Sequence, residues 1–241
     1  MVTYVSLVNE LLRRLNEVTL DIAGDGFDTV CNVQALAKDA VNSSVRLILQ
    51  EGQEWPFLKT TYTQTLTAGT RQYSFPADYS SVDWDTFYIK KLASKNNGPQ
   101  RLKTISYEEY IDKYRSIDDT GDTINGDAPP NLVYQTYGED FGVTPVPDAA
   151  YEVEYVYWSY PADMTIYNDI CVIPDRFKHV VIDGAMMFMM RFRSNEQSAA
   201  MHQKNFEDGI KAMRRVLMDD PIQIRSTVVS RGRTTAFNGG N

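Results

Sequence analysis

Cysteine and histidine are both scarce in this chain of 241 residues. The two cysteines, Cys31 and Cys171, stand far apart and have no cysteine or histidine at ligand spacing. A disulfide framework or a zinc module needs several such residues close together, so neither is expected, and synthesis in a reducing cytosol is predicted. The two histidines, His179 and His202, are too few for a histidine triad or a facial metal site. We expect both to be packing or solvent-edge residues.

Excess positive charge and long hydrophobic runs are also missing. The chain has 24 Lys and Arg against 32 Asp and Glu, a formal charge of -8. Nonspecific binding to duplex DNA needs a basic footprint, so this composition argues against it. Glu10, Arg13 and Arg14 interrupt the apolar pattern of the first residues, so we expect neither a signal peptide nor a membrane span there. The expected protein is soluble and is not exported by the usual route.

Apolar residues are abundant, at 43% of the chain with 12% aromatic, and suffice for one large domain or two small ones. In the first part of the chain they recur with a helical period. Leu7, Leu11 and Leu15 form the stripe of a helix predicted over residues 3–20, and a second helix is predicted over residues 33–52.

The pattern changes at Trp55-Pro56, where a proline interrupts the helical period. Over residues 59–161, β-branched and aromatic residues alternate with polar ones and are separated by turn residues. This predicts an antiparallel sheet or sandwich of about five to seven strands. Within it, Ser106 and Glu109 fit a capping box, which predicts a short helix over residues 107–114.

Helical patterns return after Pro174, which suits a first helical turn because its missing N–H would be unpaired there. Apolar residues from Phe177 to Arg191 predict a third helix. Ser194 begins a second capping-box signature, which is predicted to open the fourth helix, and Pro221 is expected to stop it. The residues after it contain three arginines and no acid.

These patterns predict an α+β fold: a helical bundle from the N- and C-terminal helices, an inserted antiparallel β-sheet or sandwich, and an extended C-terminal tail. The predicted boundaries place the N-terminal helices at 1–56, the β-rich insertion at 57–163, the C-terminal helices at 164–220 and an arm at 221–241.

Motifs for catalysis are absent from the sequence. Neither Lys-Thr pair follows a glycine-rich turn, and no Gly-x-Ser-x-Gly pentapeptide occurs. Asp83 and Asp85, like Glu152 and Glu154, share a strand face as a glycosidase pair would, but simple alternation explains them. We therefore expect no enzyme, no catalytic residue and no cofactor.

Two acidic segments, 21–28 and 118–127, are the candidates for calcium. Neither has the Asp-x-Asp-x-Asp-Gly register with a distal glutamate that such a site uses. We expect no metal, with the second segment left open, and we expect residues 118–130 to form a long exposed loop.

The fifteen tyrosines concentrate in the strand region. Such tyrosines more often fill a sandwich core or an interface than stack on sugars or bases. The stacking interpretation gives an alternative function, a carbohydrate-binding β-sandwich module of a host-recognition protein.

The third predicted helix is apolar on every side, because four methionines surround Phe188. Such a helix must be buried on every side. Two interpretations stay open: neighbouring copies of the chain cover it, with a glycine allowing close approach of another helix, or one chain forms a thick core. The candidate subunit-interface residues are Phe177, Gly184, Met187, Met190, Phe206 and Met213.

Four features together carry a family resemblance. They are Trp55-Pro56-Phe57 after the second helix, the strand pair over residues 73–79, Ile173-Pro174 before the third helix, and the 199–213 pattern of the fourth. In this order the chain resembles the head-to-tail adaptor, or head completion, proteins of short-tailed bacteriophages. The resemblance covers nearly the whole chain through short motifs.

The resemblance implies a structural virion protein: a homo-oligomeric ring, usually of about twelve copies, that lies beneath the portal protein and joins it to the tail nozzle. Double-stranded DNA would pass through without specific binding, which suits an acidic protein because like charges repel. We expect no membrane contact and synthesis in the host cytoplasm. The strand region is expected to face the next tail component.

The C-terminal arm is the candidate for docking to the portal, since arginines make bidentate contacts to carboxylates and an arm can order on its partner. The alternative is a loose terminus with no binding role. The candidate portal-binding residues are Ile222, Ile224, Arg225, Val228, Val229, Arg231, Arg233 and Phe237.

Overall fold

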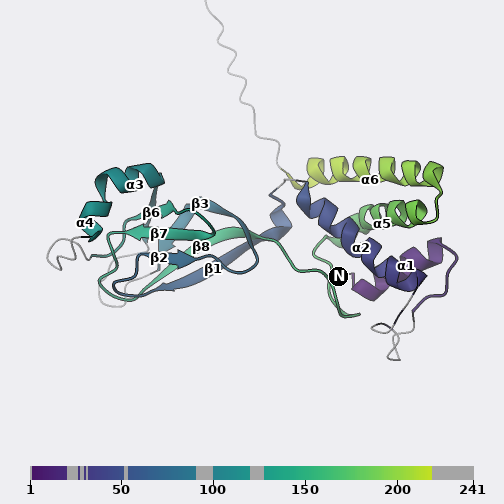
Figure 1. Ribbon diagram of the computed structural model, residues 1–241, viewed down its shortest axis with the longest axis horizontal. Helices are drawn as coiled ribbons and strands as arrows, with labels where there is room; N and C mark the ends of the chain where they lie inside the picture. The colour runs from purple at the N-terminus through teal and green to yellow at the C-terminus, as the bar shows by residue number, and fades with distance from the viewer. Residues whose placement is uncertain are drawn as a thin grey trace, which may run out of the picture.

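The computed structural model describes residues 2–20, 27, 30, 32–51, 54–90, 100–119 and 128–218. It confirms the α+β fold. A helical lobe, formed by α1, α2, α5 and α6, and a strand lobe, formed by β1–β8 with α3 and α4, lie at the two ends of the long axis (Figure 1). The predicted C-terminal tail lies outside the described residues.

The helical lobe combines helices from both ends of the chain: α1 (Tyr4–Arg14), α2 (Val33–Gln50), α5 (Lys178–Phe192) and α6 (Glu196–Leu217). The apolar stripes of α1 and α2 pack with α5 and α6 into one hydrophobic core. α5 contacts each of the other three helices. Among the described residues, no helix is both long and apolar enough to span a bilayer.

The first helix is shorter than predicted. It ends at Arg14, and not near Leu20, because Asn16 adopts a left-handed conformation with φ 56° that breaks the helical path. The chain then folds back on the helix. The Asn9 side chain binds both backbone groups of Leu20: its Oδ1 accepts from the amide at 2.7 Å, and its Nδ2 donates to the carbonyl at 3.1 Å. Leu20 is thereby buried without being helical.

The starts of α5 and α6 also differ from the prediction. Pro174 precedes a short 3-10 turn, η2 (Asp175–Phe177), and α5 begins only at Lys178. The N-cap of α6 is Asn195, whose Oδ1 accepts from Ser198 N at 3.1 Å. Ser194 cannot serve as this cap because it holds the left-handed turn, with φ 54°, that reverses the chain between the two helices.

α5 is buried on nearly all sides by its own chain. Met186, Met187 and Met189 are at most 4% exposed, and Phe188 and Met190 are half-buried. Gly184 makes this burial possible, because it lets α2 and α6 approach α5 closely. A Cβ there would lie 2.2 Å from Ser44 Oγ of α2 and 2.8 Å from the Phe206 ring of α6. The thick single-chain core is therefore the interpretation that the structure supports.

Trp55 marks the passage from helices to strands. Its ring is fully buried, its indole N–H donates to Ile48 O at 3.0 Å, and it stacks on Phe57 at 5.7 Å. The following turn, η1 (Pro56–Leu58), has its proline at the first position, where no donor is needed. β1 begins directly after it.

The described part of the strand lobe contains two four-stranded sheets. Their orders are β1-β8-β3-β4 and β2-β7-β6-β5. The strands are β1 (Lys59–Leu66), β2 (Gln72–Ser74), β3 (Tyr79–Ile89), β4 (Gln100–Arg101), β5 (Lys103–Ile105), β6 (Leu132–Gln135), β7 (Asp140–Thr144) and β8 (Tyr151–Ser159).

One strand pair departs from the antiparallel prediction: β5 and β6 run parallel. Parallel neighbours need a crossover connection in place of a hairpin. Here α3 (Tyr107–Lys113) and α4 (Arg115–Asp119) lie between the two strands in the sequence. The predicted cap of α3 is confirmed, since Ser106 Oγ accepts from Glu109 N at 3.1 Å. The Glu109 side chain pairs instead with Lys113, one turn on.

Aromatic rings fill the space between the two sheets. Phe75, Phe87, Phe141 and Tyr155 contact one another with centroids 4.7 to 5.7 Å apart. A smaller cluster under α3 stacks Tyr110 on Tyr134 at 3.9 Å. Many of the tyrosines are therefore core residues, as the alternating pattern predicts.

The contact at Gly184 gives a test of the helical core. Gly184→Ala should lower the free energy of unfolding by about 1–2 kcal/mol, because overpacking outweighs a helix-propensity gain of about 1 kcal/mol. Ser44 cannot simply rotate away, since its hydroxyl donates to Val181 O at 2.8 Å in the core. Urea unfolding measures the change.

A double-mutant cycle provides the control. In a Ser44→Ala background the closest contact is gone, so Gly184→Ala should cost at least about 0.5 kcal/mol less. Equal costs in the two backgrounds would show that the Ser44 contact does not limit packing at this position.

Candidate functional site

The six candidate interface residues lie in or against the helical core of a single chain. Five are buried, and Met190 is half-buried. Gly184 does allow close helix packing, but with α2 and α6 of the same chain. These side chains therefore offer little surface to a second copy. Whether copies associate, and through which residues, stays a prediction. The six are Phe177, Gly184, Met187, Met190, Phe206 and Met213.

The candidate portal-binding residues all fall outside the described part of the chain, so their assignment also stays a prediction. The described chain ends at Met218, which follows α6. This end of α6 lies beside the end of α2, where Arg214 pairs with Glu51. The eight residues are Ile222, Ile224, Arg225, Val228, Val229, Arg231, Arg233 and Phe237.

Residues 160–173, here called the strap, return from β8 to the helical lobe. The strap is tied to the N-terminus by backbone hydrogen bonds: Tyr4 N donates to Asp169 O at 2.8 Å, and Cys171 N donates to Val2 O at 3.0 Å. Asp169 also shapes the strap itself. Its carboxylate accepts from the amides of Ile166 and Thr165, which hold its pKa below the ordinary value.

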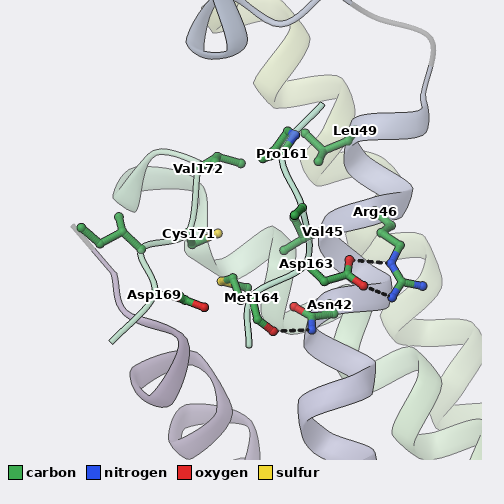
Figure 2. A pocket seen from close by; sticks show the side chains of 12 residues that line it. Asn42, Val45, Arg46, Leu49, Pro161, Asp163, Met164, Asp169, Cys171 and Val172 are labelled. Carbon is green, nitrogen blue, oxygen red and sulfur yellow. Dashed lines mark hydrogen bonds and ion pairs between the residues drawn. The ribbon is translucent and has the colours of Figure 1, made fainter. Parts of the chain in front are cut away.

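A pocket of about 260 Å³ lies between the strap and α2 (Figure 2). Arg46 and Asp163 face each other at its rim as a bidentate ion pair, and the guanidinium lowers the pKa of Asp163. Asn42 fixes the strap from α2 by donating to Met164 O at 2.9 Å. The remaining lining is mainly apolar and includes Cys171, whose thiol pKa is raised by burial. Such a pocket can hold an apolar side chain.

Sequence reasoning missed this pocket. The residues that form it come from α2 and from the strap, more than a hundred positions later, and the strap has neither a helical nor a strand period. The strap also exposes apolar residues in a short stretch, namely Tyr160, Ile166, Tyr167 and Ile170. Exposed apolar residues that gather in this way mark a contact surface.

The two histidines occupy the positions expected of structural residues. His179 is exposed on α5. The ring of His202 is 13% exposed and its Nδ1 lies 3.1 Å from Asp183 Oδ1, which links α6 to α5. Among the described residues, no group of three or more His, Cys, Asp or Glu side chains is arranged to hold a metal ion.

The acidic strand residues are dispersed among basic partners. Asp83 pairs with Lys59 at 3.4 Å, and Asp85 pairs with Arg101 at 2.7 Å. On β8, Glu154 binds Lys90 and the hydroxyl of Tyr88, and its pKa is lowered by these contacts. Glu152 is exposed on the same strand.

An open groove of about 540 Å³ lies at the α3 side of the strand lobe. It is lined by Trp84, Tyr107 and Tyr137, and the last of these is 84% exposed. The Tyr107 and Tyr137 rings meet edge to face with centroids 4.8 Å apart. This is where the carbohydrate-binding alternative would have its stacking surface.

β1 forms one open edge of its sheet. It pairs with β8 in continuous register from Lys59 to Leu66 and has no other strand neighbour among the described residues. Its first five residues are exposed. The Tyr62 ring, 37% exposed, lies on the inner face and contacts Tyr155 at 5.8 Å.

The acidic segment 118–127 is described only at Asp118 and Asp119, which belong to α4 and not to an exposed loop. The Asp118 carboxyl is half-buried. Thr144 Oγ1 donates to Asp118 Oδ1 at 3.2 Å, while Oδ2 is buried and finds no hydrogen-bond donor among the described residues. Burial is the main cause that raises the Asp118 pKa above its ordinary value.

The sequence that folds in this way matches a known protein family. A family model described as "SU10 adaptor protein" matches residues 2–231, which span both lobes. A search of curated proteins found no significant match.

The raised pKa of Asp118 predicts a pH dependence of stability. The native state holds the Asp118 proton to higher pH than the unfolded chain, whose aspartate pKa is about 3.9. The contribution of this group to stability is therefore full below that pH and is lost as pH rises through the folded pKa. Relative to Asp118→Asn, the wild-type protein should lose stability as pH rises from about 4. Urea unfolding at several pH values measures the difference.

Asp112→Asn is the matched control, because Asp112 is an exposed carboxylate on the neighbouring helix α3. It should not reproduce the trend. A difference between wild type and Asp118→Asn that stays constant with pH, or grows in the opposite sense, would contradict the raised pKa.

Proposed function

Because the chain belongs to the SU10 adaptor family, a family of phage head-to-tail adaptors, we propose that it forms a ring that joins the portal to the tail nozzle and lets DNA pass. The family makes it a structural component of the virion that contacts other virion proteins. The ring, its expected copy number of about twelve, the two partners, the passage of DNA and synthesis in the host cytoplasm belong to the proposal.

The observation that carries the proposal is the extent of the family match. It covers helices from both ends of the chain and the strands between them. An adaptor must present different surfaces to the components above and below it. The elongated arrangement of a helical lobe and a strand lobe supports this role, since it separates two kinds of surface by the length of the molecule (Figure 1).

In the proposed ring, the helical lobe supplies the rigid part. Its core is complete within one chain, so each copy can enter the assembly already folded. The strap, with exposed Ile166, Tyr167 and Ile170, offers an apolar surface for contact with a neighbouring copy or with the portal. The strand lobe then faces the next tail component.

The charge of the chain supports the passage of DNA. A formal charge of -8 per copy, repeated around a ring, repels a polyanion on average. Attraction of a few phosphates per copy would instead hold the genome in the channel. The protein needs no catalytic group for this role.

The C-terminal arm provides the contact to the portal. Its three arginines are not accompanied by any acidic residue, so they are available to carboxylates of a partner. Arginine suits such a contact because its planar guanidinium binds a carboxylate through two hydrogen bonds. The arm would order as it binds, and the ordering cost would be offset by these contacts.

Mixing the full-length chain with purified portal tests the proposed function. We expect a complex of defined mass that shows a ring by electron microscopy. A chain that stays free of the portal under all mixing conditions would contradict the proposal.

Truncation after Asp220 tests the arm separately. The truncated chain should keep its cooperative unfolding, because every residue of the described core precedes the cut. It should lose most of its affinity for the portal, measured by co-sedimentation. A full-length variant with Arg225, Arg231 and Arg233 changed to Gln is the matched control for charge. Undiminished binding by the truncated chain would show that the arm does not provide the contact to the portal.

A further inference from the structure

A ring requires two different, complementary surfaces on each copy, because a head-to-tail contact must repeat until it closes. The side chains first expected at this contact are covered by the same chain. We therefore expect the contact to use other parts of the protein. If the copies form the ring proposed above, the surfaces that join them lie elsewhere on each chain.

The open edge of β1 is one suitable surface. An edge strand presents a row of unpaired N–H and C=O groups that can pair with another strand. Proteins commonly protect such edges with a proline, a bulge, a short strand or a charged residue, above all lysine. β1 runs for eight residues in continuous register with β8 and contains no proline, and its one charged residue, Lys59, lies at its first position and pairs with Asp83.

The other edge strands in the described part of the lobe are too short for the same role. β4 has two residues, and β2 and β5 have three each. An incoming strand of eight residues would find most of its backbone unpaired there. Length alone therefore singles out β1.

The complementary surface is in the C-terminal arm. Residues 222–229 match β1 in length and contain no proline, glycine or acid. Five of them are β-branched, as strands favour. In a strand, Ile222, Ile224 and Val228 would share one face with Ser226, and Arg225 would lie on the other face with Gln223, Thr227 and Val229.

These two faces match the two sides of β1. On the inner side, Tyr62 is partly exposed at the rim of the aromatic core, and apolar side chains of an added strand would cover it. On the outer side, Thr63 and Thr65 are short, and they pair with Glu154 and Glu152 of β8.

Strands lie about 4.8 Å apart, so an added strand would be about 10 Å from β8. Across the short threonines, an arginine at position 225 can reach the exposed carboxylate of Glu152. This gives the outer face charge complementarity, while three of the four side chains on the opposite face are apolar.

We propose that residues 222–229 of one copy add a strand to the β1 edge of the next copy. The donor and the acceptor are different surfaces of each chain, so the contact repeats head to tail as a ring requires. This contact would use Ile222, Ile224, Arg225, Val228 and Val229 between copies and not at the portal, so that residues 230–241, with Arg231, Arg233 and Phe237, remain for the portal. The strand links neighbouring copies, and the last part of the arm links the ring to its partner.

Hydrogen exchange on the full-length chain tests this contact. The probe is a synthetic peptide of residues 221–230, added in large excess at a protein concentration where the chain is monomeric by mass. Backbone amides of residues 59–66 should exchange several-fold more slowly, with no change at β2 or β5. The control is the same peptide with Thr227→Pro, which keeps the charge but removes a backbone donor from the middle of the strand.

Unchanged exchange in β1, or equal protection by the proline peptide, would overturn the proposal. If the chain is oligomeric at every workable concentration, the comparison is made between the wild type and a full-length Thr227→Pro/Val229→Pro variant. Exchange in residues 59–66 should then be several-fold faster in the variant. Identical exchange in the two proteins would equally overturn the proposal.

The same variant separates this inference from the proposed function. A protein that binds the portal but shows no arm-dependent protection of β1 is an adaptor whose copies are joined in another way. A protein with a protected edge and no affinity for the portal retains the strand contact but not the adaptor role.

Discussion

The rest of the structure depends on the burial of α5. Apolar residues cover most of its surface, with Lys178, His179 and Arg191 as exposed polar residues near its ends, so water must be excluded from most of the helix between them. The chain meets this requirement with α1 and α2 from one end of the sequence and α6 from the other. Because the N- and C-terminal helices must pack together, everything between them has to leave the helical core and return to it. The strands lie in this intervening part of the chain, and the strap leads the chain back to the helical lobe.

A complete helical core changes what the molecule can offer to partners. Since most of α5 is already covered by its own chain, we expect assembly to use features outside the core: the exposed apolar residues of the strap, the open edge of β1 and the arm. Contacts of this kind suit a component that is made as a folded chain and is then incorporated into a larger particle. They contribute to assembly without making the fold of one copy depend on the next.

Much of the fold was predictable from local chemistry. Alternation of polar with β-branched and aromatic residues located the strand region over residues 59–161, and a hydroxyl three residues before an acid found the cap of α3. The predictions that were wrong depended on backbone conformations or on contacts between segments that are distant in the sequence. The left-handed turns at Asn16 and Ser194 leave little sequence signal, and the parallel β5–β6 pair follows from a crossover that short strands do not announce. The six candidate interface residues show a limit of sequence reasoning, because an apolar surface looks alike whether its cover comes from the same chain or from another, and their role between copies stays a prediction. The pocket beside Arg46 joins segments that no local pattern connects.

The central claim is that the helical core is complete in one chain, and the concentration dependence of unfolding tests it most directly. If α5 is covered only by its own chain, the urea midpoint of the chain truncated after Asp220, which lacks the strand proposed to join copies, should stay the same over about a hundredfold range of protein concentration, because unfolding is then unimolecular. A midpoint that rises with concentration would show that neighbouring copies stabilise the fold, which would contradict the account.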